Sequence, residues 1–256
     1  VGGCPGDNLT PLDIVKFVSA YATWLKKGAG KEKARIVLGR DARISGDMYA
    51  KLVSATLSGL GHDVINIGLA TTPTTEIAVT AENADGGIIL TASHNPKQWN
   101  ALKLLNSRGE FLSDKDGKQV LAMAEKEEFE YADVDNLGNI TEKDYTQYHI
   151  DEVLGLELVN KKAIAEANLR VVVDAVNSVG GIVIPRLLKA LGVNDVIELN
   201  CEPTGRFAHN PEPIPENLMQ IANKMKECRA DIGIVVDPDV DRLALISENG
   251  EMFGEE

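Results

Sequence analysis

Cysteine, aromatic side chains and basic charge are all scarce in this chain of 256 residues. The three cysteines, Cys4, Cys201 and Cys228, are scattered and odd in number, which excludes a disulfide framework and a C-x-x-C zinc site. Such cysteine usage is typical of a reducing compartment, and we expect a cytoplasmic protein. No apolar run reaches the roughly 18 residues that a membrane-spanning helix needs, so we expect no membrane partner.

The charge balance is acidic. The chain has 39 Asp and Glu residues against 26 Lys and Arg residues, which gives a formal net charge of -13. A negative surface repels the phosphates of nucleic acids and of anionic lipids, so neither is expected as a partner. The hydrophobic share of 44% is ordinary for a globular protein, and no feature of the sequence specifies an oligomeric state.

Short apolar runs alternate with helical patterns along the chain, which is typical of sheets covered by helices on both faces. An acidic, weakly patterned stretch at 127–141 interrupts the series, which then restarts at 170–174. We therefore expect an α/β fold of two consecutive domains, 1–155 and 156–256, with mixed, mostly parallel sheets. The strands expected from the runs are 34–39, 64–67, 87–91, 101–105, 170–174, 196–199, 231–236 and 243–246.

A serine follows one of these expected strands, in the sequence T-A-S-H-N-P at 91–96. Loops at the carboxyl ends of parallel strands face the ligand crevice, so Ser93 is placed to meet a substrate. A plain turn is an equally good interpretation from spacing alone, because Ser, Asn and Pro are common turn residues. A serine hydrolase fits poorly, since no G-x-S-x-G elbow is present and neighbouring side chains on extended backbone point apart, which places His94 badly as a base for Ser93.

Three carboxylates follow another buried strand, in D-P-D-V-D-R at 237–242. Asp237, Asp239 and Asp241 can surround one hard cation if the loop curls, and oxygen ligands of this kind suit Mg²⁺. A solvated acidic turn is less consistent with the apolar strands on both sides. An EF-hand is excluded because Arg242 stands where its loop needs glycine. A haloacid-dehalogenase-type site fits Asp237 and Asp239 but not Asp241.

A third polar segment, G-R-D-A-R at 39–43, also ends an expected strand. The guanidinium of Arg43 can hold a phosphate or orient the loop of Ser93. An Asp-Arg pair that merely closes the loop is at least as consistent with the sequence.

Taken together, these segments resemble the α-D-phosphohexomutase family over essentially the whole chain. T-A-S-H-N-P, with Asn100 and Lys103 downstream, is similar to that family's phosphoserine loop, and D-P-D-x-D-R to its magnesium loop. G-R-D-x-R-x-S-G at 39–46 and G-R-F-A-H-N-P-E-P at 205–213 resemble two further family segments. The four motifs in this order are far more specific than any one of them.

The resemblance implies a mechanism and roles. Ser93 carries a phosphoryl group and, with the three aspartates, binds one Mg²⁺; a bisphosphorylated sugar is the intermediate, and a glucose 1,6-bisphosphate-type activator loads the serine. Lys103 is implied in proton transfer, and His94 in contacting substrate or phosphoserine. The implied phosphate or substrate contacts are Arg242, Arg43 and Asn95.

The resemblance also implies sugar phosphates as partners, with glucose or mannose phosphate expected and phosphoglucosamine as the alternative. A catalytically idle binding module and a simple phosphate-releasing hydrolase remain alternatives from other classes. The family's third and fourth domains have no counterpart in this sequence. We therefore expect this chain, taken as a fragment, to be weakly active or inactive by itself.

Overall fold

The computed structural model describes residues 1–30 and 32–255, and these form two compact units. The amino-terminal unit comprises residues 1–40, 45–92 and 98–145. The carboxy-terminal unit comprises residues 146 onward together with two short segments, Asp41–Ile44 and Ser93–Lys97. These two segments are inserted between stretches of the amino-terminal unit in sequence, yet they make most of their contacts with the carboxy-terminal unit.

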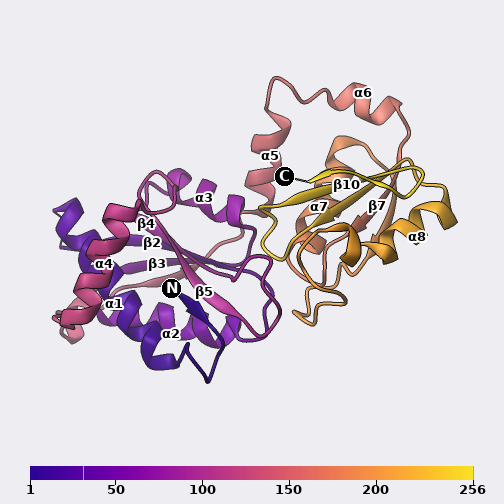
Figure 1. Ribbon diagram of the computed structural model, residues 1–256. Helices are drawn as coiled ribbons and strands as arrows, with labels where there is room; N and C mark the ends of the chain where they lie inside the picture. Colours follow the sequence, from indigo (N-terminus) through magenta and orange to yellow (C-terminus); the bar gives the residue numbers. More distant parts are fainter. Residues whose placement is uncertain (31, 256) are drawn as a thin grey trace. The chain divides into compact units, whose positions relative to one another are not determined.

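The amino-terminal unit is an α/β/α layered domain around a mixed sheet (Figure 1). Its elements are β1 (Gly2–Gly3), α1 (Pro11–Ala29), β2 (Arg35–Arg40), α2 (Gly46–Gly59), β3 (Asp63–Leu69), α3 (Thr72–Ala81), β4 (Gly86–Leu90), β5 (Asn100–Leu105), α4 (Asp114–Lys126), a short 3-10 helix (Val134–Asn136) and β6 (Ile140–Glu142). The strand order is β1-β5-β4-β2-β3-β6, with parallel pairing from β4 to β6 and antiparallel pairing at β5 and β1.

Alternation along the central strand β2 explains why helices cover both faces of this sheet. Ile36 and Leu38 belong to the core beneath α1, α2 and α4, whereas Val37 belongs to the core beneath α3. Successive side chains of a strand point to opposite faces, so a run of three apolar residues fills both cores at once. The strand therefore sequesters apolar surface on both sides, as the continuous apolar run predicts.

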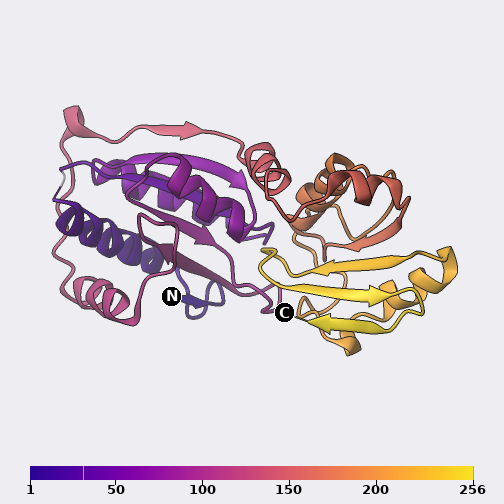
Figure 2. The same cartoon turned by 90° about the horizontal axis from the view of Figure 1, so that it is seen from above.

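The carboxy-terminal unit repeats this plan with fewer strands, which can be followed from above in Figure 2. Its elements are α5 (Thr146–Leu154), α6 (Lys161–Glu166), β7 (Arg170–Asp174), α7 (Gly180–Leu191), β8 (Asp195–Leu199), a 3-10 helix (Pro215–Asn217), α8 (Met219–Cys228), β9 (Ile232–Val236), β10 (Leu243–Ser247) and β11 (Met252–Glu255). The strand order is β11-β10-β9-β7-β8. Val172 packs into the core on the α8 side, and Val171 and Val173 pack into the core on the α7 side.

The expectation of two α/β domains with mixed sheets is confirmed. In the second sheet, however, β9-β10 and β10-β11 are antiparallel, so parallel pairings do not predominate there. The sequence places the domain boundary between residues 155 and 156, whereas the compact units divide after Tyr145. The reason is that α5 packs on α7 and so groups with the second unit.

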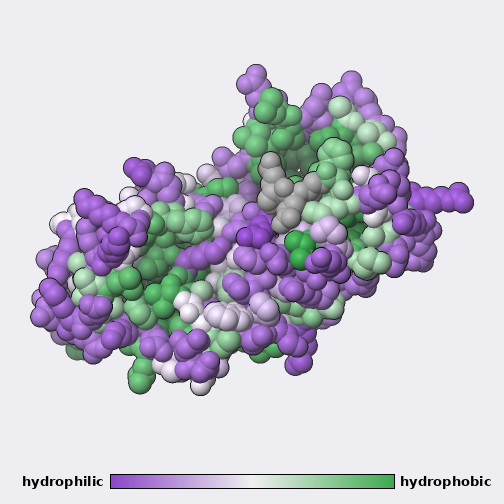
Figure 3. Space-filling view, viewed as in Figure 1, coloured by the Kyte–Doolittle hydropathy of each residue, from purple (hydrophilic) through white to green (hydrophobic). Residues whose placement is uncertain are grey.

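On the face shown in Figure 3, apolar patches are separated by hydrophilic residues. Among the described residues, none of the helices combines the length and the apolar character needed to cross a lipid bilayer.

Helix α1 carries two fully buried hydroxyl groups that differ in their hydrogen bonding. The Tyr21 hydroxyl donates to the carbonyls of Leu105 (2.6 Å) and Gly87 (3.1 Å) on two strands of the sheet. The Ser19 hydroxyl is also fully buried but has no hydrogen-bond partner in the part of the chain that the structure describes. An unsatisfied buried hydroxyl destabilises the fold, whereas a satisfied one contributes to it.

We therefore expect opposite effects from removing the two hydroxyls. Tyr21→Phe should lower the free energy of unfolding by about 1–2 kcal/mol, because two buried carbonyls lose a donor. Ser19→Ala should leave it unchanged or raise it by up to about 1 kcal/mol. Urea unfolding of the two variants beside the wild type measures both, and a destabilised Ser19→Ala variant would contradict the assignment.

Candidate functional site

Ser93 lies just beyond the carboxyl end of β4 and is half-buried. Its backbone is left-handed, with φ 51°, a conformation that residues other than glycine adopt uncommonly and that is enriched at functional sites. Its hydroxyl Oγ donates to Oδ2 of Asp237 at 3.1 Å, which joins the serine loop (Ser93–Lys97) to the acidic loop (Asp237–Arg242). The structure thus brings together the two motifs that the sequence separates by 144 positions.

The His94 ring lies on the same side as the Ser93 hydroxyl. Its Nδ1 is 3.4 Å from Ser93 Oγ, which is long for a hydrogen bond but close enough to meet a group attached to that oxygen. The expectation that the two side chains point apart is wrong, because it assumed extended backbone and Ser93 is left-handed. His94 therefore lies beside the serine hydroxyl.

Arg43 holds the serine loop through hydrogen bonds to its backbone carbonyls. Its guanidinium is buried and donates to three carbonyls of the serine loop, those of Ser93 (2.5 Å), Asn95 (2.7 Å) and Pro96 (2.7 Å). Its Nε donates to Asp41 Oδ2 at 2.9 Å, and both side chains of this ion pair have zero exposed area. A planar group with five donors can satisfy this set, whereas a lysine ammonium cannot. Of the two roles expected for Arg43, the geometry favours orienting the serine loop over holding a phosphate.

The acidic loop gathers three carboxylates around one point. Oxygens of Asp237, Asp239 and Asp241 lie within 4.8 Å of one another, and the first two residues are fully buried. Asp237 Oδ1 accepts from the backbone N–H groups of Asp241 (3.1 Å) and Arg242 (3.2 Å), which curls the loop back on itself. The curl requires a left-handed φ of 61° at Val240, an outlier for a β-branched residue and a mark of a conformation held by its surroundings.

The electrostatics of this loop favour a cation. Burial, followed by the charges of Asp239 and Asp241, raises the pKa of Asp237 to about 8. Three carboxylates at this spacing repel one another unless protons or a cation neutralise them. Carboxylate oxygens are the ligands of hard divalent ions, so Asp237, Asp239 and Asp241 fit Mg²⁺ by their chemistry. Ser93 Oγ, 3.1 Å from Asp237 Oδ2, is a further oxygen beside this cluster.

Ser178 links the arginine segment (Asp41–Ile44) to the acidic loop. Its fully buried hydroxyl accepts from the Ala42 N–H (3.3 Å) and donates to the Pro238 carbonyl (2.6 Å). The sequence analysis did not single out Ser178. The signal available was its position, four residues after the end of β7, where the loop ends of this sheet meet.

The remaining predicted site residues are Arg242, Asn95 and Lys103. Arg242 is partly exposed, with its guanidinium 3.9 Å from the Glu212 carboxylate. Asn95 contributes its backbone carbonyl to Arg43. Lys103 belongs to the amino-terminal unit, where its Nζ lies 5.4 Å from the centre of the Phe111 ring. Ser93, His94, Asn95, Arg43, Arg242 and the three aspartates all belong to the carboxy-terminal unit.

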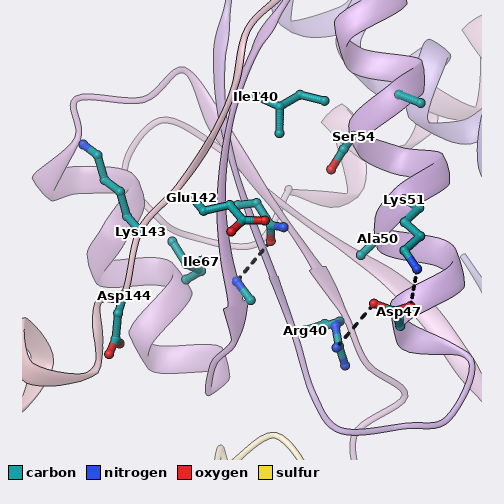
Figure 4. A pocket seen from close by; sticks show the side chains of 13 residues that line it. Arg40, Asp47, Ala50, Lys51, Ser54, Ile67, Ile140, Glu142, Lys143 and Asp144 are labelled. Carbon is teal, nitrogen blue, oxygen red and sulfur yellow. Dashed lines mark hydrogen bonds and ion pairs between the residues drawn. The ribbon is translucent and has the colours of Figure 1, made fainter.

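A cavity of about 710 Å³ opens in the amino-terminal unit between α2, the end of β3 and β6 (Figure 4). Figure 4 shows Arg40 and Lys51 directed at Asp47, at 3.8 and 2.7 Å. Several of its charges therefore neutralise one another, and none of the predicted site residues lines it.

Comparison with known proteins defines the class. Residues 2–131 match phosphoglucomutase/phosphomannomutase alpha/beta/alpha domain I, and residues 147–250 match domain II of the same family. The division of the fold into two α/β units agrees with this match. The chain belongs to the phosphoglucomutase/phosphomannomutase family.

Individual relatives carry more than one substrate name. The phosphoglucomutase/phosphomannomutase of Thermococcus kodakarensis is 37% identical over 99% of this chain and 55% of its own length. A Pyrococcus abyssi protein named a probable phosphoglucosamine mutase is 34% identical over 96% and 51%. A crystal structure of a family protein from Burkholderia thailandensis matches with a TM-score of 0.84 at 27% identity, covering 98% of this chain and 54% of that one. The chain thus spans about half the length of the relatives that it matches.

We expect the acidic loop to lower the free energy of unfolding when no cation is bound and to raise it when one is bound. In the presence of EDTA, Asp239→Asn should raise the free energy of unfolding by about 1 kcal/mol, because it removes one buried carboxylate from beside Asp237. Added Mg²⁺ should raise the melting temperature of the wild type and leave that of Asp239→Asn unchanged. Thermal unfolding with and without the ion measures both effects.

The matched control is Asp135→Asn, which alters an exposed carboxylate outside the cluster and should respond to Mg²⁺ as the wild type does. Equal stabilisation of the wild type and Asp239→Asn by Mg²⁺ would contradict a cation site at the acidic loop.

Proposed function

We propose that this chain supplies the phosphoryl-accepting serine and the metal loop of a Mg²⁺-dependent phosphohexomutase, an enzyme that interconverts hexose 1-phosphate and hexose 6-phosphate. The observation that carries the proposal is the contact of Ser93 Oγ with Asp237 Oδ2 at 3.1 Å, at the edge of the three-carboxylate cluster. A nucleophilic hydroxyl beside a cation site is what phosphoryl transfer requires, because positioning and charge neutralisation carry most of its catalysis. Membership of the family supports the same reaction.

The chemistry can be written with the residues of the chain. Ser93 Oγ loses its proton and forms a bond to phosphorus as the bond from phosphorus to the donor's oxygen breaks. That oxygen leaves with the bonding electron pair and takes up a proton to become a hydroxyl. In the reverse direction the phosphoryl group passes from Ser93 to a sugar hydroxyl, giving a bisphosphorylated sugar. Bound at the three aspartates, Mg²⁺ would offset the negative charge of the transferring group.

Other side chains take supporting roles in this proposal. Arg43 fixes the backbone of Ser93 through three carbonyls, so the nucleophile is held before the substrate arrives. His94, beside Ser93 Oγ, contacts the phosphoryl group, and Arg242 and Asn95 contact phosphate or substrate. Lys103 is the proposed proton-transfer group for the attacking sugar hydroxyl.

The substrate proposed is glucose or mannose phosphate, with glucosamine phosphate as the alternative. The name of the Thermococcus relative supports the first, and that of the Pyrococcus relative supports the second. In either case, a sugar 1,6-bisphosphate is the proposed activator, because it can deliver a phosphoryl group to an unmodified serine.

The test is phosphoryl acceptance rather than mutase turnover, because the chain spans about half the length of its relatives. Incubated with glucose 1,6-bisphosphate and Mg²⁺, the chain should gain about 80 Da by intact-mass spectrometry. Peptide mapping should place the gain at Ser93, and Ser93→Ala should abolish it. Parallel incubations with mannose and glucosamine bisphosphates rank the donors.

The control is Ser107→Ala, which removes an exposed hydroxyl and should accept phosphate as the wild type does. Phosphate released to solvent without passing through Ser93 would indicate a hydrolase instead. Absence of both incorporation and Mg²⁺ binding would indicate a non-catalytic binding module.

A further inference from the structure

The loop that carries G-R-F-A-H-N-P-E-P has no role in the reaction described so far, yet it packs directly against the arginine segment. Phe207 places its ring over the Arg43 guanidinium, with 5.1 Å from the guanidinium carbon to the ring centre. An aromatic face attracts a cation most strongly where water is excluded, and the Arg43 side chain has no exposed area. Phe207 therefore holds the face of the guanidinium whose edges bind the serine loop.

The backbone of the same loop touches the arginine segment at Gly205. A Cβ built there would lie 2.0 Å from the Ala42 carbonyl oxygen, and the residue has φ 68°, in the left-handed region. Its N–H donates to the Asn177 carbonyl at 2.9 Å. A glycine is required because both the space and the backbone conformation exclude a side chain. The close approach fixes where Phe207, two residues later, meets Arg43.

An ion pair between His209 and Asp174 lies at the carboxyl end of the segment that begins at Gly205. His209 Nε2 lies 3.2 Å from the buried Asp174 carboxylate, and Nδ1 lies 2.8 Å from the Asn210 carbonyl oxygen. Both partners are acceptors, so the protonated form of the ring can donate to both of them. Burial alone lowers the pKa of His209, but the hydrogen bond to Asp174 and its charge outweigh burial and raise the pKa. Among the residues that the structure describes, Asp174 is the charged group whose electrostatic attraction raises the pKa of His209.

We propose that residues 204–209 are a positioning loop for Ser93, in which Phe207, held by the Asp174–His209 ion pair, keeps Arg43 against the carbonyls of the serine loop. Phe207 and His209 are positioning residues, since they act on Ser93 through Arg43. The consequence for catalysis rests on the proposed function of Ser93, whereas the consequence for the order of the serine loop does not.

The first test replaces the aromatic face. Phe207→Leu keeps apolar volume but loses the attraction for Arg43, so backbone hydrogen exchange in the peptide containing residues 93–97 should become about five- to tenfold faster. The rate of phosphoryl acceptance by Ser93 should fall by a similar factor. Phe207→Tyr keeps the aromatic face, so its exchange rate at residues 93–97 and its rate of phosphoryl acceptance should both match those of the wild type. Phe253→Leu is the matched control, because Phe253 is exposed and the ring that lies over Arg43 is that of Phe207.

The second test uses pH. The raised pKa of His209 means that the ion pair is fully formed below the ordinary histidine pKa of about 6.5 and is lost as pH rises through the higher folded value. Protection of residues 93–97, corrected for the intrinsic exchange rate, should fall over that alkaline range in the wild type. In His209→Gln, protection should be low and independent of pH.

The outcomes separate the two proposals. Faster exchange in Phe207→Leu but no phosphate on Ser93 in any variant would support the positioning loop and contradict the proposed function. Wild-type protection in both Phe207→Leu and His209→Gln would overturn the positioning loop. Equal effects of Leu and Tyr at position 207 would also overturn it, and urea unfolding of each variant shows that the comparison is between folded chains.

Discussion

The crowding of three carboxylates beside one hydroxyl is the constraint on which the rest of the site depends. Asp237 and Asp239 are fully buried, and Asp241 is close enough to add its charge to theirs. Repulsion between such groups disfavours the arrangement, so the surrounding structure must hold it in place. The left-handed valine in the acidic loop and the two N–H groups that bind Asp237 show how the backbone does so.

The serine loop is held by the opposite kind of charge. Arg43 brings a buried guanidinium to three loop carbonyls, with Asp41 balancing its charge. Ser178 then connects the arginine segment to the acidic loop through one hydroxyl. The cationic and anionic parts of the site are therefore linked by hydrogen bonds, and the reactive oxygen of Ser93 lies where they meet.

Much of this could be predicted from local sequence signals. The apolar runs locate the strands because a strand buried on both faces needs continuous apolar residues, and loops at strand ends collect polar side chains. The sequence analysis missed α1, although Thr10 and Asp13 form a capping box at its start. The contact of His94 with Ser93 depends on a positive φ that residue type alone does not specify. The contacts of Ser178 with Ala42 and of Phe207 with Arg43 join residues more than 100 positions apart, which no local pattern encodes.

The boundary between the units also depends on packing that local sequence patterns do not specify. Segments 41–44 and 93–97 follow strands of the first unit but group with the second, so the site is built from both halves of the sequence. Continuous domain limits cannot express this, because packing rather than chain order decides which unit a loop joins. The family match stops at 131 and resumes at 147, on either side of the division after Tyr145.

The most direct measurement of the central claim is a calorimetric titration of Mg²⁺ into two forms of the chain, one with unmodified Ser93 and one with phosphoserine at that position. The account predicts one ion per chain in both forms, bound about tenfold or more tightly when the phosphoryl oxygens join the carboxylates. Equal affinity in the two forms, or binding that survives Asp237→Asn, would contradict a cation site shared by Ser93 and the acidic loop.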